Sequence, residues 1–271
     1  MVFSGLPFLY LFFPLVALLY FAFKNRTYRN TLLLLFSLFF YAWGEPKYVV
    51  LMILSALVAY IGGIVIKGYD VKGEKGKKKA AMIITAALIV SNLLVFKYLN
   101  FILDNVSLIT GLKRGGINLI LPIGISFYTF QILSYVIDLY KNEIALQRNF
   151  FYLLLYVSFF PQLIAGPIVR YQTVEEEILT RKESFDDFVA GLKRFIIGLS
   201  KKIIIANNVS SVAEIIYKGN PESYGSFMFW IAAVCYALQI YFDFSGYSDM
   251  AIGLGKILGF NFMENFRYPF I

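Results

Sequence analysis

The side chains best suited to chemistry are concentrated in residues 241–256, directly after an apolar run at residues 227–240. If the stretch is helical, four polar residues fall on one face: Tyr241, Ser245, Ser248 and Asp249. Their spacing of i, i+4, i+7 and i+8 is that of one helix face. Asp243 and Tyr247 fall on a different face. A charged group at bilayer depth costs several kcal/mol unless it faces protein or a wet cavity. We therefore expect the stretch to line a cavity; the alternative is a helix end in the aqueous interface.

The chemistry open to these residues is limited. On a helix, Asp243 and Asp249 point about 120° apart, so they are poorly placed to work as an acid–base pair. A serine nucleophile needs a base to activate it, and the sequence contains no histidine. No His/Cys cluster predicts a metal site, and no phosphate-binding glycine loop is present. These residue types alone do not identify an enzyme.

Two further polar groups lie within apolar segments. Residues 158–171 place Gln162 and the exit residue Arg170 around a break made by Pro161, Gly166 and Pro167. Residues 117–140 are broken early by Pro122 and Gly124, and they carry along one side Gln131, Ser134 and Asp138. Each set could line a cavity, and the alternative for the first is an ordinary helix kink. Arg170 could bind a phosphate or carboxylate, or anchor a helix end.

The composition predicts an all-α polytopic membrane protein. The chain has 271 residues, of which 59% are hydrophobic and 15% charged, a balance too apolar for a soluble domain. The net charge of +8 lies in the loops between apolar runs, so it indicates membrane orientation, and we expect no nucleic-acid partner. We expect one membrane-embedded domain over residues 1–271, in the cell (cytoplasmic) membrane.

The apolar runs predict the elements that position these groups. We expect membrane segments at residues 6–23, 31–43, 48–66, 80–103, 117–140, 149–169 and 227–240. Between them we expect a flexible linker at residues 67–79, a loop at 104–116 and a soluble segment at 172–187. Residues 185–212 form an amphipathic pattern suited to an anionic membrane surface, with a polar side made of Lys193, Arg194, Lys201 and Lys202.

The distribution of lysine and arginine predicts the topology. Residues 24–29 and 67–79 are rich in them and residues 44–47 are poor, which places the first two loops in the cytoplasm and the N-terminus outside. Strict alternation would then place the basic residues 170–202 outside. The conflict disappears if residues 149–169 enter the membrane and return to the same side, as a broken backbone covered by protein can do.

Several segments in order resemble one family. They include Phe40-Tyr41-Ala42-Trp43-Gly44, Phe160-Pro161-Gln162 and the stretch from Tyr241 to Asp249, together with residues 1–4, 121–131, 134–138 and 166–170. In these the chain resembles the N-terminal part of the membrane-bound O-acyltransferase (MBOAT) superfamily, in its bacterial alginate O-acetylation branch.

The resemblance implies a helical bundle around a tunnel, truncated in this chain. It implies a donor, acetyl-CoA or another acyl thioester, and a polysaccharide acceptor, reached directly or through a secreted or membrane-anchored partner transferase. The family's active-site histidine lies beyond Ile271, so no catalytic residue is assigned here. The tunnel-lining candidates are Gln131, Asp138, Pro161, Gln162, Gly166, Arg170, Tyr241, Asp243, Ser245, Tyr247 and Asp249.

Two other functions remain open. D-alanyl transfer to teichoic acids differs from polysaccharide O-acetylation only in donor and acceptor. A small transporter or channel-like protein would also have broken helices and lysine-rich loops. No bound cofactor and no metal are expected in any of the three.

Overall fold

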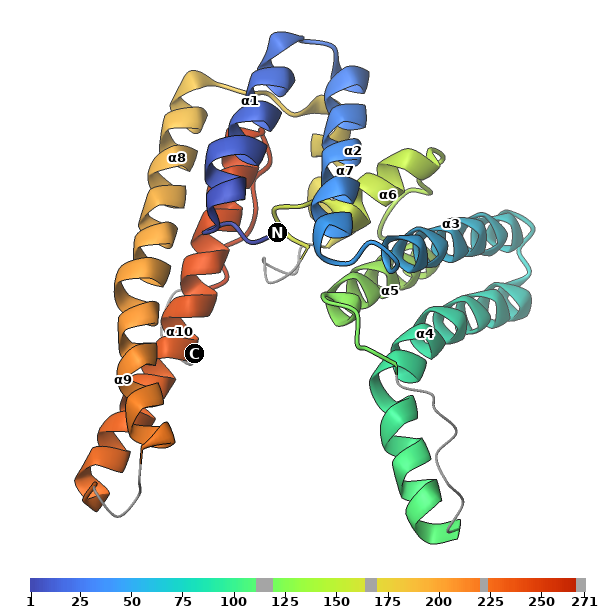
Figure 1. Cartoon of the computed structure of the whole chain (residues 1–271). Helices are drawn as coiled ribbons and strands as arrows, with labels where there is room; N and C mark the ends of the chain where they lie inside the picture. The colour runs from blue at the N-terminus through green and yellow to red at the C-terminus, as the bar shows by residue number, and fades with distance from the viewer. Residues whose placement is uncertain (111–118, 164–169, 220–223, 267–271) are drawn as a thin grey trace. The chain divides into compact units, whose positions relative to one another are not determined.

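The computed structural model describes residues 1–110, 119–163, 170–219 and 224–266. Within those ranges every regular element is a helix (Figure 1). Contacts divide the described chain into two units, one made of residues 1–18 and 179–266 and the other of residues 19–163 and 170–178. The single domain expected over residues 1–271 stays a prediction.

Three helices of the described chain are long and apolar enough to cross a membrane. These are α3 (Val49–Val71), α4 (Lys75–Thr110) and α10 (Ser226–Ile257). A shorter apolar helix covers Phe8–Ala22 and consists of η1 (Phe8–Phe12) and α1 (Phe13–Ala22). The chain is an integral membrane protein, and the predicted all-α membrane bundle is confirmed.

The second unit is built around the antiparallel pair α3 and α4. Helix α5 (Ile125–Lys141) packs against both of them, and α2 (Arg26–Gly44) packs against α6 (Phe150–Ser158). The start of α2 is fixed by Asn25, whose side chain accepts a hydrogen bond from the Tyr28 amide at 3.1 Å. The last helix of this unit is α7 (Tyr171–Thr180).

Two sequence-based expectations about loops are wrong. Residues 67–79 were expected as a flexible linker, yet only three residues separate α3 from α4, with Gly73 at a φ of 73°. Asp70 accounts for the order, because it accepts from Lys67 at 2.7 Å and from Lys78 at 2.6 Å. Residues 104–110, expected as loop, continue α4 to Thr110. Polar residues at 104, 105 and 107 interrupt the apolar side chains there, so no apolar run marks this part of the helix.

The predicted backbone breaks are confirmed where the structure describes them. Helix α5 begins only after Gly124, which adopts a φ of 76° that favours glycine. Helix α6 ends at Ser158, ahead of Pro161. The remainder of the predicted re-entrant segment, including Gly166, lies outside the described residues, so re-entry stays a prediction.

The first unit is dominated by one long helical hairpin. Helix α8 (Phe185–Ser200), the wider turn η2 (Lys201–Ala206) and α9 (Asn207–Lys218) run continuously along α10, as Figure 1 shows in orange and red. Ser184 caps the start of α8 by accepting from the Asp187 amide at 3.0 Å. The predicted helix over residues 185–212 is therefore present, and it lies lengthwise against a candidate membrane span.

Candidate functional site

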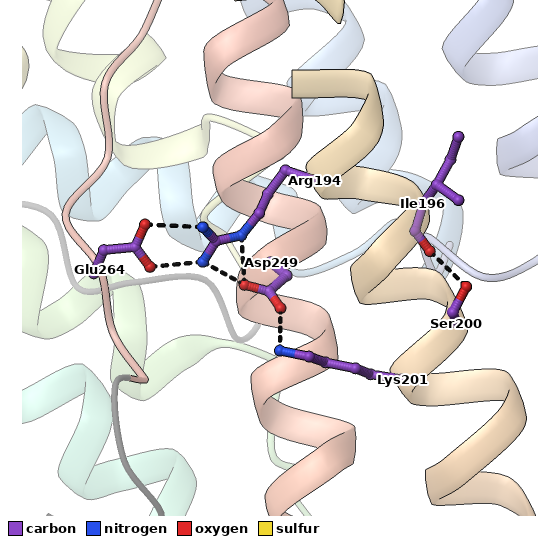
Figure 2. Close-up of polar contacts among 6 residues, drawn as sticks. All are labelled: Arg194, Ile196, Ser200, Lys201, Asp249 and Glu264. Atoms are coloured by element: carbon purple, nitrogen blue, oxygen red, sulfur yellow. Dashed lines mark hydrogen bonds and ion pairs between the residues drawn. The ribbon is translucent and has the colours of Figure 1, made fainter. Parts of the chain in front are cut away.

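Asp249 of α10 is the buried centre of a partly exposed ion-pair network. Its side chain is 7% exposed, and two cations from the neighbouring hairpin arm bind its two oxygens (Figure 2). Arg194 donates through Nε to Oδ1 at 2.7 Å, and Lys201 donates through Nζ to Oδ2 at 2.5 Å. A buried carboxylate is tolerated when it is paired in this way.

Arg194 also binds a second carboxylate, Glu264, which lies beyond the end of α10. Its Nη1 donates to Oε1 at 3.0 Å and its Nη2 to Oε2 at 2.6 Å, the two parallel bonds of a bidentate pair (Figure 2). One guanidinium therefore connects α8, α10 and the segment that follows α10. Two cations face two carboxylates, so the network of Arg194, Lys201, Asp249 and Glu264 is close to neutral.

Paired glycines bring these charges together. A Cβ added to Gly198 would lie 2.5 Å from the carbonyl oxygen of Gly246, and one added to Gly191 would lie 2.6 Å from that of Gly253. The glycines are seven residues apart on each helix, so both contacts fall on one face. We call these four residues the glycine seam. The seam allows the backbones to touch, and Arg194, Lys201 and Asp249 each lie three residues after one of its glycines.

Asp243 makes a separate ion pair with Lys202 of η2. The two carboxylates of α10 therefore have different partners, as expected of groups that point in different directions. The expectation that Arg194, Lys201 and Lys202 face an anionic membrane surface is wrong, because all three bind carboxylates within their own unit. Lys193 alone of that group is exposed.

The hydroxyl groups of this stretch are buried. Ser245 is 1% exposed and Ser248 is 2% exposed, and neither Oγ has a hydrogen-bond partner among the described residues. The hydroxyl of Tyr247 is likewise buried without such a partner, and its ring stacks on Phe3 with centroids 4.6 Å apart. The ring of Tyr241 contacts Phe266 edge-on at 6.0 Å. Buried hydroxyls normally find partners, so these three are exceptions among the buried polar groups of the described chain.

A cavity of about 240 Å³ lies beside the ion-pair network. Its walls include Arg194, Lys256, Asn261 and Glu264. Binding pockets for small molecules usually measure about 300–1,000 Å³. This cavity lies below that range, and the predicted tunnel-lining roles stay predictions.

In the second unit the predicted site residues lie on α5 and just after α6. Gln131 and Asp138 are buried on α5, and each has a side-chain oxygen with no hydrogen-bond partner among the described residues. Gln162 is buried and donates through Nε2 to the carbonyl of Tyr156 at 2.6 Å. Pro161 is buried and Arg170 is exposed. Gly166 lies outside the described residues.

Sequence reasoning missed the partners of the carboxylates. Glu264 was not proposed, and Arg194 and Lys201 were assigned to the membrane surface. The signal that could have identified Arg194 and Lys201 is the equal spacing of the two glycine pairs, 191/198 and 246/253, with a cation three residues after each glycine of the first pair and Asp249 three residues after Gly246. Chemically, the network can hold two helices and the segment after α10 in fixed register. Neither Asp243 nor Asp249 is left unpaired to act as a base.

The chain is similar to known proteins over its whole length. Residues 141–270 match the model of "MBOAT, membrane-bound O-acyltransferase family". A probable alginate O-acetylase AlgI of Pseudomonas syringae is 38% identical over 100% of the chain and 52% of its own length. The corresponding protein of Azotobacter vinelandii is also 38% identical, over 100% of the chain and 54% of its length.

The chain is also similar to the peptidoglycan O-acetyltransferase of Helicobacter pylori, which is named for another polymer. It is 33% identical over 97% of the chain and 55% of its own length. The chain therefore spans about half the length of the curated relatives it matches.

Proposed function

Because residues 141–270 carry a domain of the membrane-bound O-acyltransferase family, we propose that the chain is the N-terminal part of an enzyme that transfers acetyl groups to an exported polysaccharide. The observation that carries this proposal is the 38% identity to alginate O-acetylases along the entire chain. The chain would work in the cytoplasmic membrane. The donor would be acetyl-CoA or another acyl thioester, and a partner transferase could pass the acyl group to the polymer.

The described residues would help to position the substrates, and they would not take the proton from the acceptor. The ion-pair network fixes α8, α10 and the segment containing Glu264, and these surround the cavity of about 240 Å³. The general base that takes the proton from the acceptor hydroxyl would come from outside these 271 residues, because the sequence contains no histidine. A cavity wall that positions a substrate needs charged and hydroxyl groups held in fixed places.

Loss of Asp249 tests this proposal. We expect Asp249→Asn, introduced in the organism that encodes the chain, to lower the acetate released by mild base from its exported polysaccharide by about tenfold to a hundredfold. Glu214→Gln is the matched control, because Glu214 is exposed and, within the described residues, its ion pair is with Lys218 on the same helix. An immunoblot for the protein separates lost activity from lost protein. Normal acetate with both Asp243 and Asp249 neutralised would contradict the proposal.

D-alanyl transfer to teichoic acids is the weaker candidate. The teichoic acid D-alanyltransferase of Bacillus subtilis is 31% identical, but over only 57% of the chain. The same base treatment distinguishes the two candidates, because it would release D-alanine in place of acetate.

A further inference from the structure

A groove runs along the seam between α3 and α4, far in sequence from the ion-pair network. Its volume is about 420 Å³, and the walls are mainly apolar, with the exposed side chains of Ile61, Val65, Ile84 and Leu88 along its length. Tyr69 and Lys77 close one end. Both helices are candidate membrane spans, so a groove left uncovered between them would face lipid.

The groove exists because α3 and α4 meet tightly on one side only. A Cβ added to Gly62 would lie 2.3 Å from the side chain of Thr85, so the helices touch at that point. The neighbouring Gly63 faces α5, where Leu139 would lie 3.1 Å from an added Cβ. Helix α5 thus covers one side of the pair, and the side with Ile61 and Val65 remains open.

The length of the groove matches one leaflet of a bilayer. Its lining residues on α3 extend from Val58 to Tyr69, which is about 16 Å along a helix. The hydrocarbon core of a bilayer is about 30 Å thick, so each leaflet is about 15 Å deep. An acyl chain of one leaflet would therefore fill the groove from end to end.

The closed end of the groove carries a strong positive charge. Residues 67–79 form the end of α3, the short turn and the start of α4. They hold six lysines against two acidic residues, Asp70 and Glu74. Asp70 pairs with Lys67 and Lys78, and Glu74 pairs with Lys77 at 2.6 Å. The structure gives no carboxylate partner, among the residues it describes, to Lys72, Lys75 and Lys79. The predicted topology places this end at the cytoplasmic face, where anionic lipids are enriched.

We propose that the groove between α3 and α4 binds an anionic glycerophospholipid. One acyl chain lies along Ile61, Val65, Ile84 and Leu88, and the phosphate lies among the lysines of residues 72–79. The apolar walls account for the chain, and Lys77 at the closed end, together with the exposed lysines beside it, accounts for the headgroup. A neutral lipid would satisfy only the first of these.

Native mass spectrometry of the purified chain in neutral detergent tests the proposal. Phosphatidylglycerol and phosphatidylcholine with identical acyl chains serve as probes, and we expect the anionic lipid to bind at least tenfold more tightly. A lysine near a charged membrane surface is worth about 1 kcal/mol, so Lys75→Gln and Lys77→Gln should each weaken phosphatidylglycerol binding about fivefold. Both side chains are at the surface, so neither change should unfold the protein.

Lys97→Gln is the matched control, because Lys97 is an exposed lysine of the same helix. It lies 20 residues from Lys77, about 30 Å along the helix axis. We expect this change to leave binding unaltered. Ala81→Trp places a bulky ring in the groove and should weaken binding of both lipids.

Three results would overturn the proposal. The first is equal affinity for the two lipids. The second is an equal loss of affinity in the Lys77 and Lys97 variants, which would mean unspecific attraction. The third is displacement of phosphatidylglycerol by glycerol phosphate at equal concentration, which would mean that the acyl chain contributes nothing.

Discussion

Arg194 is shared by two carboxylates, and its planar guanidinium is what makes the sharing possible. It offers a fork to Glu264 and its Nε to Asp249. A lysine in the same place would supply one point charge and could not make both contacts in this geometry. The residue type is therefore as important as the charge.

We predict that Arg194→Gln lowers the free energy of unfolding by about 1–2 kcal/mol. Removing one partner of a buried ion pair costs about 3–5 kcal/mol, and the one-third exposure of the Arg194 side chain reduces that figure. Thermal unfolding in detergent, followed by circular dichroism, measures the change. Arg194→Lys should recover only part of the loss.

The control for this prediction is Lys218→Gln. Lys218 pairs with Glu214 one turn away, and both side chains are more than half exposed. Such a pair is worth about 0.3–0.5 kcal/mol, so its loss should barely change unfolding. Equal effects of the Arg194 and Lys218 changes would show that the network around Asp249 contributes nothing specific.

At the scale of elements, the glycine seam sets the distance between α8 and α10. We predict that Gly198→Ala destabilises the hairpin by about 1–3 kcal/mol, because its Cβ would lie 2.5 Å from a backbone carbonyl that cannot turn aside. The unfolding measurement described above detects this. Amide hydrogen exchange of residues 245–250 should also become faster as the helices separate.

Gly68→Ala is the matched control, since it makes the same change within α3 where nothing lies within 4 Å of the added Cβ. Alanine favours a helix over glycine by about 1 kcal/mol, so this variant should be more stable than the parent chain. Destabilisation by both substitutions would contradict the role given to the seam.

The positions of α3, α4 and α10 could be predicted from the sequence, because apolar runs reflect transfer into lipid directly. The break before α5 could be predicted too, since Gly124 and Pro122 restrict the local backbone. The partners of Asp249 could not, because whether Arg194 faces lipid headgroups or a carboxylate depends on which helix lies beside it. That choice is made by the register of the glycine seam, a tertiary property.

At the scale of the whole molecule, the lysine-rich residues 67–79 predict how the chain is oriented in the membrane. We expect the N-terminus outside and residues 67–79 in the cytoplasm. Cysteine in place of Lys75, in a chain whose Cys235 is replaced by serine, should resist a membrane-impermeant thiol reagent in intact cells and react after the cells are opened. Cys235 is the only native cysteine, so the background is low. Ready labelling of intact cells would reverse the topology.

We also predict that the purified 271-residue chain shows no acyl transfer by itself. Proton removal from a sugar hydroxyl near neutral pH suits histidine, with an unperturbed pKa of about 6.5, and the chain has none. General base catalysis contributes about 10²–10⁴-fold to a rate, so its loss should reduce turnover to background. Release of free thiol from an acetyl thioester, with polysaccharide present, measures this. Robust turnover would mean that a carboxylate acts as the base.

The charge pairing along the hairpin has a consequence for biogenesis. A hydrocarbon core about 30 Å thick takes about 20 residues, so a span that begins at Phe227 reaches Asp243 before it leaves the membrane. An unpaired aspartate opposes insertion by about 2.5–3.5 kcal/mol at the centre of a span and by less near its end, where Asp243 lies. Lys202, which pairs with Asp243, is synthesised first, because η2 precedes α10 in the chain. The hairpin can therefore enter the bilayer as one neutralised unit, with its first arm retained beside the insertion channel until the second arm arrives.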